Sequence, residues 1–303
     1  MDSGVLLSLQ NVGKSFDKVR ALDGVSFAVP RQSIYGILGP NGAGKTTALR
    51  IITTILKPDQ GQVYFNGEPL QDRHASLMGY MPEERGLYKK MMVGEQLIYL
   101  ARLKGLNAQQ AKKQLSFWLE KFDIKNWYNK KVEDLSKGMA QKVQFIATIL
   151  HQPQLIILDE PFSGLDPINT RLIEEEIRSL SQQGATILFS THRMEQVEEF
   201  CEHILLINKG RVILSGKVSE IRQRFKRNEY SFHYEGQRPD LPEKVNIVRD
   251  ENHELVVKLP PQLSGNDLLR ELIARNVHIT AFAELLPSLN EIFISQVAAS
   301  AHE

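Results

Sequence analysis

The stretch "IYGILGPNGAGKTTALRII", residues 34 to 52, joins an apolar run, a glycine-rich turn and a helix-like pattern. Residues 39–46, "GPNGAGKT", match the phosphate-loop pattern G-x-x-x-x-G-K-[ST]. Glycines let the backbone wrap so that successive N–H groups face phosphate oxygens, and the following helix adds its N-terminal dipole. Because a strand precedes the motif and a helix follows it, the stretch predicts an α/β nucleotide-binding domain.

The phosphate loop also assigns roles to its residues. Lys45 should reach the β- and γ-phosphates, and the Thr46 hydroxyl should hold Mg²⁺. The other residues that we expect around the phosphates are Gly39, Pro40, Asn41, Gly42, Ala43, Gly44 and Thr47. The alternative, a glycine-rich turn that matches by chance, is much weaker because the flanking elements fit the motif.

An acidic pair ends a second apolar run, "LIILDE", residues 155–160. Open α/β sheets bind ligands at the carboxyl ends of their strands, which is where Asp159 should lie. Asp159 is the expected Mg²⁺ partner, and Glu160 is the candidate for polarising the attacking water. The alternative is an acidic cap for the next turn, and the phosphate loop favours the functional interpretation.

His192 follows the apolar run "ATILFS", residues 185–190. A histidine after a strand is usually a surface or capping residue. Here the strand should run beside the Asp159 strand, which would bring His192 near the γ-phosphate. Its position, and not its residue type, makes it a catalytic candidate.

The bulk composition is that of a folded protein. The chain has 303 residues, with 42% hydrophobic and 24% charged residues, and its length predicts two domains. Lys plus Arg (37) nearly equals Asp plus Glu (36), so no global field favours nucleic acid, and no nucleic-acid partner is expected. The one cysteine fits a reducing cytosol.

No secretory signal or spanning helix is expected. The start "MDSGVLLSLQN" lacks a basic region, and every apolar run is far shorter than the roughly 20 residues that a bilayer needs. A role at a membrane would therefore come through a partner.

Periodicity and capping signals divide the chain further. They predict short strands over 5–38, a helix over 45–57 stopped by Pro58, a tight turn at Asn66-Gly67, and a hairpin over 203–216. A helical insertion over about 88–150 contains helices near 92–104, 108–122 and 138–150. Asp166 should cap a helix that begins at Pro167.

The last part of the chain has a different character. The basic stretch "IRQRFKRNEY", residues 221–230, is interpreted as a solvated helix end. Beyond it, 254–259 and 278–285 predict strands, while "SGND" (264–267) and "SLNE" (288–291) resemble capping boxes. We expect a small α+β domain over 228–303.

The stretch "LSKGMAQ", residues 135–141, begins a predicted helix, with Ser136 as its cap. However, "LSKGMAQ", "LIILDEP", "SGLD" and "STH", in this order after "GPNGAGKTT", resemble the ATP-binding cassette ATPases over about residues 5–220. Generic phosphate-loop proteins lack the first of these segments. The resemblance implies a P-loop NTPase cassette over residues 1–222, with an antiparallel β subdomain and the helical insertion.

The resemblance also implies ATP and Mg²⁺ as cofactors and a second cassette as partner. In this family each ATP lies between one phosphate loop and the signature of the other subunit. Carried over, Ser136 and Gly138 should contact the γ-phosphate of the partner's nucleotide, with help from the helix dipole. Asp166, in "SGLD", should lie at the same junction, and a pair of identical cassettes is expected.

Three further positions follow from the family pattern. Phe16 matches the aromatic residue that stacks on adenine, with a core phenylalanine as the alternative. Glu83 replaces a common Gln that senses Mg²⁺ and the membrane partner, and a carboxylate can still ligate Mg²⁺. The signature differs from LSGGQ at Lys137 and Met139, but the phosphate-contacting Ser and the last Gly are retained.

"YMPEERGLY" (80–88), "SKGM" and the small tail domain resemble bacterial exporter ATPases of the sodium- and drug-efflux type. This implies a separate polytopic permease that docks near residues 83–88 and the helical insertion, and that holds a cytoplasmic protein at the inner face of the membrane. The alternatives are a cassette that acts on nucleic acid or ribosomes and an ATP-gated binding module with degenerate catalysis. The single phosphate loop and the lack of heptads disfavour the former, and the cargo stays open.

Overall fold

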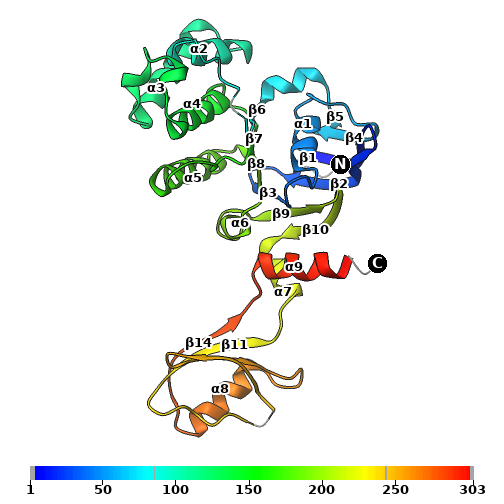
Figure 1. Ribbon diagram of the computed structural model, residues 1–303, viewed down its shortest axis with the longest axis vertical. Coiled ribbons are helices and arrows are strands. Elements are labelled where there is room, and N and C mark those ends of the chain that lie inside the picture. The colour runs from blue at the N-terminus through cyan, green and yellow to red at the C-terminus, as the bar shows by residue number, and fades with distance from the viewer. Residues whose placement is uncertain (1–3, 85, 243, 301–303) are drawn as a thin grey trace. The chain divides into compact units, whose positions relative to one another are not determined.

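The computed structural model describes residues 4–84, 86–242 and 244–300 (Figure 1). Both ends of the chain and Arg85 of "YMPEERGLY" lie outside these residues. The chain divides into two compact units, Met1–Lys217 and Val218–Glu303. The sequence placed this division between residues 222 and 228, but α7 (Val218–Arg224), which buries Val218 and Ile221, belongs to the second unit.

A six-stranded sheet, in the order β10-β9-β3-β8-β7-β6, forms the centre of the first unit. Its strands are β3 (Ile34–Leu38), β6 (Met78–Met81), β7 (Leu155–Asp159), β8 (Thr186–Thr191), β9 (His203–Asn208) and β10 (Arg211–Lys217). All neighbours pair in parallel except β9 and β10, which form the predicted hairpin. Every residue of β3, β7 and β8 is buried, as parallel strands covered on both faces require.

An antiparallel sheet, in the order β2-β1-β4-β5, packs beside it, as the family resemblance implied. Its strands are β1 (Val5–Phe16), β2 (Val19–Pro30), β4 (Gln60–Phe65) and β5 (Glu68–Pro69). Leu7 and Phe65 from this sheet, Ile37 from β3 and Leu49 from α1 (Lys45–Ile52) share one core. Asn66 and Gly67 both have positive φ (54° and 81°), so the predicted tight turn is confirmed.

The sequence predicted that the first helix extends to residue 57, and this prediction was wrong. The helix ends at Ile52, well before Pro58. The Thr53 hydroxyl donates to the Leu49 carbonyl over 2.9 Å, and Thr54 takes the left-handed conformation at φ 60°. The left-handed residue ends the helix before Pro58 can.

The helical insertion is confirmed between β6 and β7, which are neighbours in the sheet. It contains α2 (Val93–Leu103), α3 (Ala108–Lys121) and α4 (Lys137–Ile149), with single 3-10 turns at Lys125–Trp127 and Val132–Asp134, and another 3-10 segment, Asp72–Leu77, precedes β6. The Met139 N–H donates to Ser136 Oγ over 3.3 Å, so Ser136 caps α4 as predicted. Beyond β7 lie α5 (Pro167–Gln182) and α6 (Met194–Phe200), and Asp166 caps α5.

The second unit has a sheet of its own, in the order β12-β13-β11-β14. Its elements are β11 (Glu229–Glu235), β12 (Asn246–Glu251), β13 (Glu254–Lys258), β14 (His278–Leu285), α8 (Gly265–Ala274) and α9 (Leu289–Ser300). Phe232, Leu255 and Leu272 belong to its separate core. Both predicted capping boxes are present, at Ser264–Asp267 and at Ser288–Glu291.

Candidate nucleotide site

The phosphate loop connects β3 to α1 and needs its glycines. Gly39, Gly42 and Gly44 have φ values of 155°, 77° and 109°. A Cβ on Gly39 would lie 2.2 Å from the Ile207 carbonyl oxygen, and one on Gly44 would lie 2.5 Å from that of Ala21. Side chains at these two positions would therefore clash with backbone as well as strain the turn.

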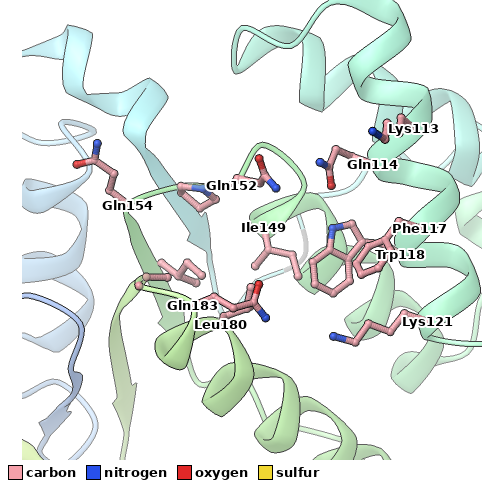
Figure 2. Close-up of a pocket in the computed structure, with 14 residues that line it drawn as sticks. Lys113, Gln114, Phe117, Trp118, Lys121, Ile149, Gln152, Gln154, Leu180 and Gln183 are labelled. Carbon is pink, nitrogen blue, oxygen red and sulfur yellow. The ribbon is translucent and has the colours of Figure 1, made fainter.

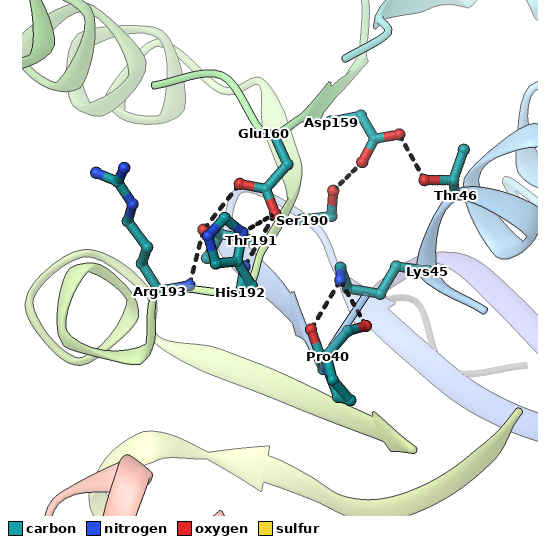
Figure 3. A network of polar contacts seen from close by, with 10 residues as sticks. Pro40, Lys45, Thr46, Asp159, Glu160, Ser190, Thr191, His192 and Arg193 are labelled. Atoms are coloured by element: carbon teal, nitrogen blue, oxygen red, sulfur yellow. Dashed lines mark hydrogen bonds and ion pairs between the residues drawn. The ribbon is translucent and has the colours of Figure 1, made fainter. Parts of the chain in front are cut away.

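Lys45 begins α1, and only 7% of it is exposed. Its Nζ donates to the carbonyls of Gly39 over 2.7 Å and Pro40 over 3.1 Å (Figure 3). Burial lowers the pKa of Lys45, and the negative charges of the carboxylates around it, Glu160 foremost, act in the opposite direction. An ammonium group held this way favours an anionic ligand.

Asp159 ends β7 with 1% of its surface exposed. The Thr46 hydroxyl donates to Asp159 Oδ2 over 3.0 Å, and the Ser190 hydroxyl donates to Oδ1 (Figure 3). Hydroxyl and carboxylate oxygens are the hard donors that Mg²⁺ prefers. The donor set that the structure brings together therefore fits the metal.

Glu160 follows β7 in the left-handed conformation, at φ 50°. Its Oε1 lies 2.7 Å from His192 Nδ1 and accepts the His192 N–H over 3.0 Å, while Thr191 Oγ1 donates to Oε2 over 3.3 Å. A non-glycine residue held in this conformation by several hydrogen bonds is typical of a functional site.

The strand that precedes His192 lies where the sequence predicted. β8 runs parallel to β7, with Asp159 beside Ser190. Sequence reasoning missed Ser190 and Thr191, although a signal was present. Both are polar residues at the end of a buried strand, directly before His192.

A cleft of about 530 Å³ lies against the phosphate loop, Asp159 and Glu160, whereas the predicted site residues Gly39, Pro40 and His192 do not line it. It is lined by Val19, Arg20, Ala21, Asn41, Gly42, Ala43, Gly44, Lys45, Thr46, Thr47, Glu83, Asp159, Glu160 and Lys209. Arg20 and Lys209 were not predicted, because nothing local marks them. Lys209 stands in the β9–β10 turn, which reaches the loop where the Gly210 N–H donates to the Ala43 carbonyl over 2.9 Å.

Phe16 ends β1 and is 44% exposed, which excludes the core alternative. It is not part of the cleft lining. However, it pairs with Val19 across the β1–β2 turn, and Val19 does line the cleft. Phe16 therefore lies close to the cleft, with the Lys14 ammonium 5.7 Å from the centroid of its ring.

Ser136, Gly138 and Asp166 do not line this cleft. Ser136 and Asp166 are exposed, and each caps a helix. The Lys137 side chain lies against Gly164 of "SGLD", because a Cβ on Gly164 would be 2.3 Å from Lys137 Cε. The signature and the "SGLD" turn are therefore in contact within one chain.

Comparison with known proteins identifies the family. A family model described as "ABC transporter" matches residues 22–163, and one described as "ATP-binding protein DrrA1-3-like, C-terminal domain" matches residues 216–297. The ABC transporter ATP-binding protein YhaQ of Bacillus subtilis is 43% identical over 297 residues, covering 97% of this chain and 99% of YhaQ. This chain belongs to the ATP-binding proteins of ABC transporters. ABC ATP-binding proteins bind ATP, couple its hydrolysis to transport, and work as dimers with a membrane subunit.

Two further relatives of this ABC protein agree with that assignment. The Nod factor export ATP-binding protein I of Burkholderia thailandensis is 38% identical over 213 residues, covering 69% of this chain and 70% of that protein. A solved structure of an ATP-binding subunit of an ABC transporter is 31% identical, with a TM-score of 0.68 and coverage of 73% of this chain and 93% of that one. In the described part of this ABC protein, no helix has the length and apolar character needed to cross a bilayer.

Proposed function

We propose that this ABC ATPase drives an export system in which two identical cassettes hold ATP between them. One observation carries the hydrolytic part of this proposal. Lys45, Thr46, Asp159 and Glu160 line a single cleft, and Glu160 is bound to His192. The export relative supports the direction of transport, and the cluster disfavours a binding module with degenerate catalysis.

The first unit would act as the ATPase domain and the second as an accessory domain. Within the cleft, the loop N–H groups and Lys45 bind the β- and γ-phosphates, and Phe16 stacks on adenine. Glu160 orients and polarises the attacking water, and His192 positions the Glu160 carboxylate through the 2.7 Å contact.

Mg²⁺ would be held by Thr46 and Asp159, whose oxygens already meet at 3.0 Å, with Glu83 at the same cleft. When bound, the metal neutralises phosphate charge during hydrolysis. Ser190 holds the second oxygen of Asp159 and so fixes the orientation of the carboxylate.

The exposed Ser136 and Asp166 and the half-buried Gly138 would complete the nucleotide site of the second cassette. Ser136 and the first turn of α4 supply a hydroxyl, N–H groups and a helix dipole, all of which favour phosphate. ATP would then hold the two cassettes together until hydrolysis removes its γ-phosphate.

The test is the solution mass of Glu160→Gln with and without MgATP. The variant should bind ATP but hydrolyse it about 10²–10⁴-fold more slowly, the usual contribution of a general base. Its mass should double with MgATP. A near-normal rate would remove Glu160 as the base, and a monomer saturated with ATP would remove the pair of identical cassettes.

A groove of about 570 Å³ between β6 and the helical insertion is our candidate docking site for the permease. Gln144 Oε1 and His151 Nδ1 line it, are buried, and have no hydrogen-bond partner among the described residues. Leu103 adds an apolar wall that is 64% exposed. A cytoplasmic helix of the permease could donate hydrogen bonds to the unpaired polar atoms and pack apolar side chains against Leu103. Binding of this helix would hold the protein at the inner face of the membrane.

This docking site can be tested by membrane fractionation of the native cells. Leu103→Asp should release the protein from the membranes. Ile55→Asp is the matched control, because Ile55 is also highly exposed (59%) but lies outside the groove. Equal membrane binding by the two variants would place the permease elsewhere.

A further inference from the structure

A second cavity, of about 540 Å³, lies between the helical insertion and the core of the first unit (Figure 2). It is lined by Lys113, Gln114, Phe117, Trp118, Lys121, Ile149, Gln152, Pro153, Gln154, Ile156, Leu180, Gln183, Gly184 and Ala185. None of these residues lines the nucleotide cleft or the proposed permease groove. Its volume falls within the range of small-molecule sites.

One buried donor in this cavity has no partner. Trp118 is only 5% exposed, and its Nε1 has no hydrogen bond to any described residue. In Figure 2 this nitrogen lies on the cavity side of the indole ring, toward Gln114. A buried N–H without an acceptor costs free energy, and an acceptor atom of a ligand would recover it.

The charged side chains of the lining indicate the sign of the charge that a ligand would carry. Two lysines line the cavity and no carboxylate does. Lys121 is already paired, with its Nζ 2.5 Å from Glu176 Oε2. Lys113 is exposed and has no ion pair within the described residues, so it is the cation available to an anionic group.

The remaining walls are apolar and aromatic. Phe117 is 52% exposed and meets Trp118 edge to face, at 5.1 Å between ring centroids and an interplanar angle of 78°. Ile149 and Leu180 lie across from these rings (Figure 2). This combination suits a planar ring that carries one acidic group.

We propose that this cavity binds an aromatic carboxylate. The carboxylate accepts hydrogen bonds from Lys113 and the Trp118 N–H, and the ring packs between Phe117 and the aliphatic wall. The ligand would touch the ends of α4 and α5 and the start of β7, whose opposite ends carry Ser136, Asp166 and Asp159.

The chain provides its own reporter of binding. It contains two tryptophans, and Trp127 does not line the cavity, so Trp127→Phe leaves Trp118 as the single emitter. The probe is 3-phenylpropionate, compared with 3-phenylpropan-1-ol and 3-phenylpropylamine, which keep the ring and change the charge. Each is titrated with and without saturating MgATP.

We expect a saturable change of Trp118 emission that is strongest for the carboxylate and unaffected by MgATP. Lys113→Met should weaken carboxylate binding about tenfold, since a hydrogen bond to a charged group contributes about that factor, and should leave alcohol binding unchanged. Lys112→Met is the matched control, because this neighbouring lysine lies outside the cavity lining. Trp118→Phe with Trp127 retained should lose the signal.

Several outcomes would overturn the proposal. They are no saturable change with any probe, equal affinity for carboxylate and amine, competition by MgATP, or equal effects of the two lysine substitutions. Because binding is read from Trp118 and not from ATP turnover, these results do not depend on the proposed function.

Discussion

The charged side chains of the nucleotide cleft are buried and lie close to one another. Lys45 is buried against two loop carbonyls, and Asp159 and Glu160 are buried at the end of β7. Each carboxylate is oriented by hydroxyls at the end of β8. Such preorganised polar groups lose little orientation when a charged ligand arrives.

Lys45→Ala should weaken ATP binding about 10–150-fold. The reason is that a hydrogen bond to a charged group contributes about 1.5–3 kcal/mol. The measurement is the rise of the thermal midpoint with increasing MgATP, which reports binding to the folded state. Lys57→Ala, at an exposed position outside the cleft, is the control. An unchanged MgATP response of Lys45→Ala would remove Lys45 from the phosphate site.

Ser136→Arg should leave ATP binding by one chain intact and prevent the MgATP-dependent doubling of mass in the Glu160→Gln background. The larger side chain would occupy the exposed N-terminus of α4, where the second cassette is proposed to dock its nucleotide. The substitution also removes the cap, so Ser136→Ala is compared to separate loss of the cap from added bulk. Doubling by Ser136→Arg would contradict the shared site.

At the level of elements, the contact of the helical insertion with β6 includes hydrogen bonds from half-buried polar side chains. Lys104, just after α2, donates to the carbonyls of Ala75 and Met78, over 2.6 and 3.0 Å. His151 Nε2 lies 3.2 Å from the same Met78 carbonyl. Burial, helped by the Lys104 charge, lowers the pKa of His151 to about 4 from 6.5.

This pKa shift predicts a pH dependence of stability. Between about pH 6.5 and 4 the unfolded chain binds a proton at His151 that the folded chain does not. The free energy of unfolding should therefore fall as pH decreases through this window. His151→Gln should show a shallower fall than the wild type in urea unfolding. His233→Gln, at an exposed histidine, should follow the wild type, and parallel curves for all three would contradict the shift.

At the scale of the whole molecule, the chain forms two units, and each has a hydrophobic core of its own. Every residue of the nucleotide cleft lies before Lys217, and the second unit has a core of its own. A chain ending at Lys217 should therefore bind MgATP within about threefold of the full chain, measured by calorimetry. A folded truncated chain that fails to bind would show that the second unit contributes to the site.

Much of this molecule follows from short stretches of sequence. The phosphate loop, the buried strands, the Asn66-Gly67 turn and the helix caps depend on local backbone geometry and on hydrogen bonds within a few residues. The family can also be recognised from the sequence, because each of its motifs is a short continuous stretch. The end of α1 was missed because the hydrophobic pattern did not indicate that Thr54 adopts the left-handed conformation two residues after Ile52.

Tertiary structure alone decided which distant residues meet. Arg20 reaches the cleft from the start of β2, and Lys209 reaches it from the β9–β10 turn. The pKa of His151 is lowered because, in the folded chain, burial and the Lys104 charge both disfavour its protonated form. The lining of the second cavity comes from α3, α4, β7, α5 and the segments next to them, and no motif in the sequence marks Trp118. Such sites depend on contacts between segments far apart in the chain, and no local pattern encodes those contacts.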